Sequence, residues 1–127
     1  MTKTAADLVA EARTEILEIA PNEVARHHHR VLIDVREPAE FATGHIEGAI
    51  NIPRGVLEFE VVADPAVANV SDPALSHKEQ TIVVYCRTGG RAALAVQSLQ
   101  RLGFRDVSSI AGGISGWIEA GLPVSAR

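Results

Sequence analysis

The sequence contains a single cysteine, Cys86, so no disulfide can form within the chain. A chain without disulfides is typical of a reducing compartment. Long hydrophobic runs are also missing, since no stretch approaches the ~20 apolar residues that a transmembrane helix needs. The first twenty residues carry four acidic side chains, unlike a secretory signal or a transit peptide. These absences predict a soluble, cytoplasmic protein without a membrane partner.

Positive charge is scarce overall but concentrated in one segment. The net charge of −4 argues against a nucleic-acid partner, which requires a basic surface. Between Gln80 and Arg105, however, the chain has no aspartate, glutamate or lysine, and it has four arginines. Two of them, Arg87 and Arg91, flank the loop that follows Cys86, where we predict an anion-binding site. The other two are expected to be ordinary exposed arginines of a helix.

Alternating sequence patterns predict an α/β fold. The 127 residues, 46% of them apolar and 22% charged, suit one globular domain. Short β-branched and apolar runs predict strands, and apolar residues at helical spacing predict helices between them. Such alternation predicts a parallel sheet with helices on both faces. The expected strands span 31–36, 49–53, 81–86 and 107–113. The expected helices span 4–17, 21–29, 37–44, 54–62, 91–103 and 114–122. Residues 63–80 are expected to be mostly loop.

The segment TIVVYCRTGGRAAL, residues 81–94, places Cys86 where a buried strand ends and a loop begins. Sites in parallel α/β sheets form beyond the carboxyl ends of strands. The reactive form of cysteine is the thiolate, and this loop offers several groups that stabilise an anion. Arg87 and Arg91 bring charge, Thr88 a hydroxyl, and Gly89 and Gly90 a turn whose backbone N–H groups can point inward, at the start of a helix. The alternative is a buried, purely structural cysteine, because free cysteine is often buried.

Three motifs resemble those of the rhodanese-like (single-domain sulfurtransferase) family, and they follow one another along the chain in the family's order. YCRTGGR resembles the family's active-site loop, LIDVREPAEFATGHIEGAINIP its N-terminal signature, and GGISGWIEAGLPV its C-terminal signature. The resemblance implies a parallel five-stranded sheet flanked by helices on both faces. It also implies a single rhodanese-like domain over residues 20–127, preceded by an N-terminal helix and lead-in strand in residues 1–19.

The resemblance further implies a mechanism. Cys86 is expected to attack a small sulfur-containing anion such as thiosulfate and to become a persulfide. A thiophilic acceptor, namely cyanide, a thiol or a protein, then takes the sulfur, and no cofactor is required. The substrate-binding residues are expected to be Arg87, Thr88, Gly89, Gly90 and Arg91. Two further expectations concern residues outside the cysteine loop. Asp34 and Arg36 are expected to hold neighbouring loops in place. Two-domain relatives have an arginine near position 40, and the glutamate found here, Glu40, argues against strong affinity for thiosulfate.

The same residues leave two other functions as alternatives. Related phosphatases and arsenate reductases have five residues between cysteine and arginine, whereas four separate Cys86 from Arg91, a loop too tight for phosphate. A non-catalytic or regulatory rhodanese-like module that binds a partner is the other alternative. No metal site is expected, because His27, His28 and His29 are adjacent in a predicted helix and point in different directions. His45 is expected to be structural.

Overall fold

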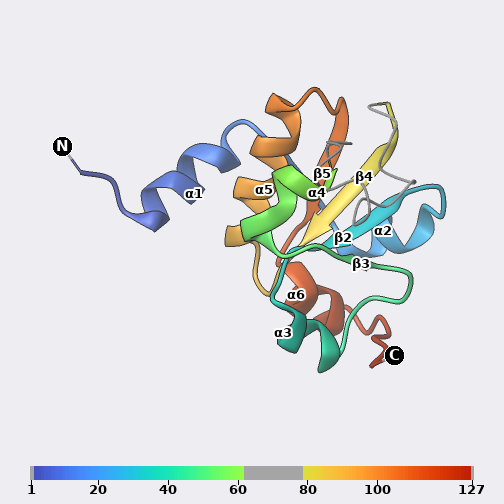
Figure 1. The fold of residues 1–127 in the computed structure, drawn as a ribbon. Coiled ribbons are helices and arrows are strands. Elements are labelled where there is room, and N and C mark those ends of the chain that lie inside the picture. Colours follow the sequence, from blue (N-terminus) through green and yellow to red (C-terminus); the bar gives the residue numbers. More distant parts are fainter. Residues whose placement is uncertain (1, 62–78, 127) are drawn as a thin grey trace.

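Five strands form one parallel sheet in the order β1-β5-β4-β2-β3 (Figure 1). The computed structural model describes residues 2–61 and 79–126. The predicted parallel five-stranded sheet is confirmed, with the strand before Cys86 at its centre. The strands are β1 (Leu17–Ile19), β2 (Val31–Asp34), β3 (Ile50–Asn51), β4 (Thr81–Tyr85) and β5 (Asp106–Ile110).

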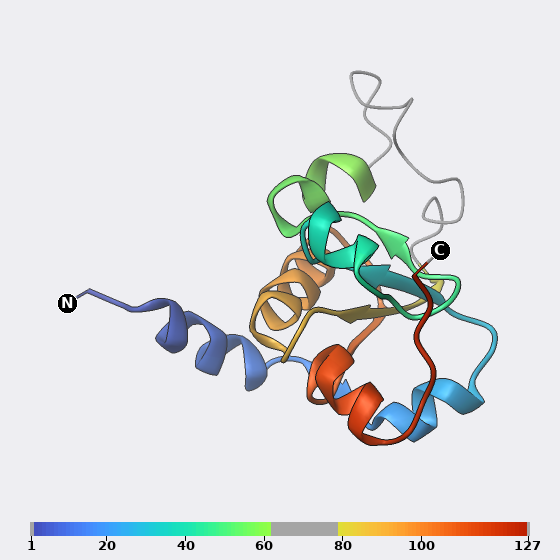
Figure 2. The same ribbon diagram turned by 90° about the horizontal axis from the view of Figure 1, so that it is seen from below.

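Helices cover both faces of this sheet, as Figure 2 shows. One face carries α4 and α5, with α1 packed on α5, and the other face carries α2 and α6. Both layers were expected from the sequence, because each parallel connection needs a crossover helix. The elements are α1 (Ala5–Arg13), α2 (Pro21–Arg26), α3 (Pro38–Ala42), a 3₁₀ turn η1 (Arg54–Val56), α4 (Leu57–Val61), α5 (Gly90–Arg101) and α6 (Gly113–Glu119).

The central strands are apolar throughout because both of their faces are buried. In β4, Ile82 and Val84 belong to the core beneath α5, whereas Val83 and Tyr85 belong to the core beneath α2 and α6. All four side chains are at most 2% exposed. Their alternation follows from the period of two along a strand. The rigid strand therefore ends in a fixed place, and Cys86 is the next residue.

Two expected helices end earlier in the structure than the sequence predicts. The helix expected over 4–17 ends at Arg13, because Leu17 pairs with Ser108 of β5 as part of the sheet. The helix expected over 21–29 ends at Arg26, since the chain is extended from His27 and has to reach β2. The expected loop over 63–80 lies almost entirely outside the described residues.

The N-terminal segment contributes to the sheet, since β1 is its edge strand. The division into residues 1–19 and a domain over 20–127 stays a prediction. In the part of the chain that the structure describes, no helix combines the length and the apolar character needed to span a bilayer.

Candidate active site

Cys86 lies at the carboxyl end of the central strand and at the start of a tight turn into α5. The residue is 2% exposed and packs with the core under α5. Gly89 adopts a φ of +125°, which side chains with a Cβ rarely tolerate, and Gly90 then begins the helix. The glycines of the loop therefore let the chain reverse direction within four residues. This reversal brings the first turn of α5 back over the sulfur.

Two backbone N–H groups point at the sulfur atom. Gly89 N lies 3.1 Å from Cys86 Sγ, and Ala92 N lies 3.4 Å from it. The N–H groups in the first turn of a helix have no partner within the helix, and the helix dipole favours negative charge at that end. The arrangement thus suits a sulfur anion. Ala92 was not among the site residues predicted from the sequence. Its position in the first turn of the predicted helix, where backbone N–H groups are free, was the signal that could have identified it.

The N-terminal turn of α6 binds the cysteine loop from the side opposite α5. Ile114 N donates to Cys86 O at 2.9 Å, and Ser115 N donates to Arg87 O at 3.1 Å. Gly113 makes this approach possible: a Cβ there would lie 2.5 Å from Arg87 O, and its φ is +61°. The N-terminal turn of α6 thus fixes two carbonyls of the cysteine loop. This role was not predicted from the sequence, where the Gly112–Gly113 pair is its local sign.

Arg91 is paired with an acidic residue from a distant part of the chain. Its Nη1 and Nη2 donate to Glu40 Oε1 and Oε2 at 2.7 and 3.1 Å. The hydrogen bond from Arg91 lowers the pKa of Glu40 to about 2, so the carboxylate is charged at neutral pH. The carboxylate of Glu40, in α3, therefore balances the positive charge of Arg91, one of the two arginines predicted to form the anion site. The sequence could not show this pairing, since the residues are 51 positions apart.

Asp34 and Arg36 form a buried ion pair beside the loop. Asp34 is fully buried and the Arg36 side chain is 7% exposed, and Arg36 Nη2 lies 2.7 Å from Asp34 Oδ2. The same nitrogen donates to Gly44 O, while the Asn51 side chain donates to the carbonyls of Asp34 and Arg36. These contacts agree with the expectation that Asp34 and Arg36 hold loops.

Arg87 and Thr88 are exposed at the outer side of the turn. Within residues 2–61 and 79–126, the Arg87 side chain has no hydrogen bond or ion pair. It lines a cleft of about 410 Å³ whose wall also includes the apolar side chains of Ile114 and Ile118. Arg87 is thus a cation available to an anion in this cleft. The other residues of the wall are Arg36, Glu40, Thr43 and Ser115.

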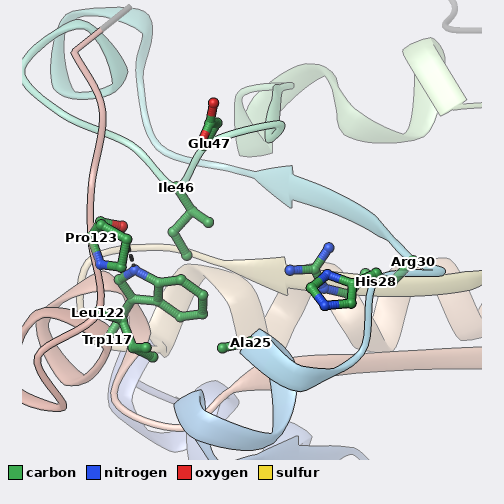
Figure 3. Close-up of a pocket in the computed structure, with 8 residues that line it drawn as sticks. All are labelled: Ala25, His28, Arg30, Ile46, Glu47, Trp117, Leu122 and Pro123. Atoms are coloured by element: carbon green, nitrogen blue, oxygen red, sulfur yellow. Dashed lines mark hydrogen bonds between the residues drawn. The ribbon is translucent and has the colours of Figure 1, made fainter.

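The histidines lie away from the loop. His45 is buried, stacks on Phe41 at 3.7 Å between ring centroids, and its Nδ1 lies 3.0 Å from Phe41 O. His28 lines a separate cavity of about 290 Å³ with Arg30 and Trp117, whose indole N–H donates to Pro123 O (Figure 3). None of residues 86–91 lines that cavity. Among the described residues, no three histidine, cysteine, aspartate or glutamate side chains converge as a metal site would require.

Fold and loop together define an α/β protein that presents one cysteine to the amino end of a helix. The chain belongs to the rhodanese-like family, because residues 20–120 match its domain. A chloroplastic thiosulfate sulfurtransferase of Arabidopsis thaliana is 41% identical over 103 residues, which cover 77% of this chain and 81% of that protein. The transferase and sulfurtransferase character expected from the sequence is therefore supported.

Solved structures agree with this assignment of the fold. A human single-domain sulfurtransferase is 30% identical, with a TM-score of 0.71 over 80% of this chain and 95% of that one. A Rhodopseudomonas palustris protein of unknown function, described as a possible tyrosine phosphatase, is 29% identical. Its TM-score is 0.84, over 98% of this chain and 96% of that one. The latter likeness covers nearly the whole chain and so includes the N-terminal helix.

Proposed function

We propose that the protein moves a sulfane sulfur from a thiosulfate-like donor to a thiophilic acceptor through a persulfide on Cys86. The observation that carries this proposal is the convergence of two backbone N–H groups, from Gly89 and Ala92, on Cys86 Sγ. Donors placed in advance stabilise an anion without reorganising when it forms. The same loop can hold the charge of the thiolate and then that of the persulfide.

In the first half of the reaction, the Cys86 thiolate attacks the outer sulfur of thiosulfate. The sulfur–sulfur bond of the donor breaks, its electron pair leaves with sulfite, and Cys86–S–S⁻ remains. In the second half, an acceptor such as cyanide attacks the outer sulfur of the persulfide. Thiocyanate leaves and the thiolate is restored, which is a ping-pong reaction with a covalent intermediate. Arg87, exposed at the cleft, is proposed to meet the anionic donor, and Thr88, Gly89, Gly90 and Arg91 to form the rest of its site.

The balance of charge around the loop bears on the donor. Of the two arginines among the described residues that line the cleft, Arg36 is paired with Asp34 and Arg87 is unpaired, while Arg91 in the cysteine loop is paired with Glu40. A dianion gains less from one exposed arginine than from two. We therefore propose that thiosulfate is accepted but bound weakly.

Mass spectrometry of the intact protein after incubation with thiosulfate tests the persulfide directly. We expect a gain of about 32 Da, one sulfur atom, confined to Cys86, lost on addition of cyanide and absent from Cys86→Ser. The absence of this gain with thiosulfate and other sulfane donors would favour the non-catalytic partner-binding module instead.

The likeness to a possible tyrosine phosphatase makes phosphatase activity worth a direct measurement. The loop has four residues between Cys86 and Arg91, and the Arg91 guanidinium is engaged by Glu40 rather than open to a phosphate. We expect no turnover of an aryl phosphate beyond that of Cys86→Ser. Turnover that depends on Cys86 would replace the sulfurtransferase proposal.

A further inference from the structure

The C-terminal end of α1 lies against the cysteine loop. In Figures 1 and 2 the helix runs toward α5 from a free end that projects away from the sheet. Ala12 is fully buried, and Val9 Cγ2 lies 3.7 Å from the point that a Cβ on Gly90 would occupy. Gln97 of α5 donates to the Glu15 carboxylate at 2.6 Å just beyond the helix. The residues that follow Ala12 are thereby placed at the turn into α5.

The Arg13 guanidinium lies beside Gly89. The N–H of Gly89 points at Cys86 Sγ, and its carbonyl accepts from Ala93 N at 2.9 Å. Arg13 Nη2 lies only 3.1 Å from the point that a Cβ on Gly89 would occupy. Glu18 Oε2 lies 3.9 Å from the same point and 3.9 Å from Arg13 Nε. A loosely paired cation is thus set directly behind the residue that binds the sulfur.

We propose that Arg13 is a positioning residue of the active site: acting through Gly89, its guanidinium favours negative charge on Cys86 Sγ, and Glu18 moderates this effect. The inference rests on the proposed role of Cys86 as nucleophile. The Arg13 and Glu18 side chains are 46% and 33% exposed, and Arg13 Nε lies 3.9 Å from Glu18 Oε2, so they form a loose ion pair in which each charge still acts on the loop. In the described part of the chain, the other charged side chains around the loop are Arg87, the Arg91–Glu40 pair and the Arg36–Asp34 pair.

The proposal extends the site beyond the residues that match the family. Arg13 and Glu18 precede residue 20, where the match to the domain begins. A charge a short distance from the sulfur and partly open to water has a modest effect, since water screens it. The sign of the effect is nevertheless definite. Removing the cation disfavours the thiolate, and removing the carboxylate favours it.

The test is the rate at which iodoacetamide alkylates Cys86 in the full-length protein, measured across pH without any sulfur donor. Because the thiolate is the species that reacts, we expect Arg13→Gln to slow alkylation at pH 7 about two- to threefold. Glu18→Gln is expected to accelerate it by a similar factor, and Arg13→Lys to restore the wild-type rate. Arg26→Gln, which removes an exposed arginine elsewhere and changes the net charge equally, is the matched control. Both effects should shrink at about 0.5 M salt.

Opposite shifts of the pH midpoint for Arg13→Gln and Glu18→Gln support the proposal, since a loss of loop support alone would expose the buried Cys86 and speed alkylation of both variants at every pH. Equal shifts in one direction, or an Arg13→Gln profile that coincides with that of Arg26→Gln, would overturn it. Glu18→Gln keeps the test decisive if Arg13→Gln loosens α1, because a pH midpoint that moves down, unlike a rate that rises at every pH, requires a charge effect on the thiolate. Alkylation requires no sulfur transfer, so this outcome is separate from the persulfide measurement.

Discussion

Glu40→Gln should weaken the fold slightly and strengthen binding of thiosulfate. The substitution keeps the size and a hydrogen-bonding group but removes the negative charge that Arg91 now balances. Arg91 lies in the first turn of α5, beside the N–H groups that hold Cys86 Sγ. An uncompensated guanidinium at that place attracts a dianionic donor. We therefore expect the KM for thiosulfate to fall about two- to fivefold.

The cost in stability follows from the pKa of Glu40, which the hydrogen bond from Arg91 lowers from 4.5 to about 2. In a dry site a change of that size corresponds to roughly 3 kcal/mol. Both side chains are more than a third exposed, so screening by water reduces the contribution to about 1 kcal/mol or less. A carboxyl group whose pKa is lowered by folding stabilises the fold fully above its ordinary value. Its contribution is lost as the pH falls from 4.5 toward 2.

Two measurements check this prediction: thiocyanate formation at varied thiosulfate, and thermal unfolding between pH 7 and pH 2. The matched control is Glu58→Gln, since Glu58 pairs with Arg54 at 3.0 Å with similar exposure but lies outside the cysteine loop and its cleft. We expect the wild type to lose its stability advantage over Glu40→Gln as the pH falls below about 4.5. If the KM of Glu40→Gln equals that of Glu58→Gln, Arg91 has no part in binding the donor, and the proposed charge balance is wrong.

Three further substitutions and one control, Gly121→Ala, test other parts of the site. Arg87→Ala should raise the KM for thiosulfate, because it removes the unpaired cation that lines the cleft. The free energy of unfolding should change by no more than about 0.5 kcal/mol, because the side chain is exposed. An unchanged KM would contradict the proposed role of Arg87. Gly113→Ala should destabilise the protein by more than about 2 kcal/mol and abolish transfer, because its Cβ would lie 2.5 Å from Arg87 O. Gly121→Ala, with a similar φ of +81° but open space around it, should cost only about 1 kcal/mol in denaturant unfolding and leave transfer intact. Cys86→Ser should abolish transfer with a loss of less than about 2 kcal/mol; a larger loss in the same unfolding measurement would favour a structural cysteine.

Much of the fold follows from local patterns in the sequence. The apolar run before Cys86 predicted the central strand, because a strand buried on both faces has no polar positions. The helix after Gly89 was equally clear from its apolar spacing. The ends of helices were less predictable. Leu17 falls within the helix expected over 4–17, yet it is in β1, because pairing with β5 outweighs a weak local preference.

The sequence alone determined that a single cysteine stands between a buried strand and a helix, in a loop with two glycines and two arginines. Only the tertiary structure decided which of these charges stay open. Glu40 reaches Arg91, α6 binds the carbonyls of Cys86 and Arg87, and Arg13 lies over Gly89. The physical reason is that periodicity along the chain reports which side of an element is buried. Contacts between residues far apart in the sequence arise only when the elements pack.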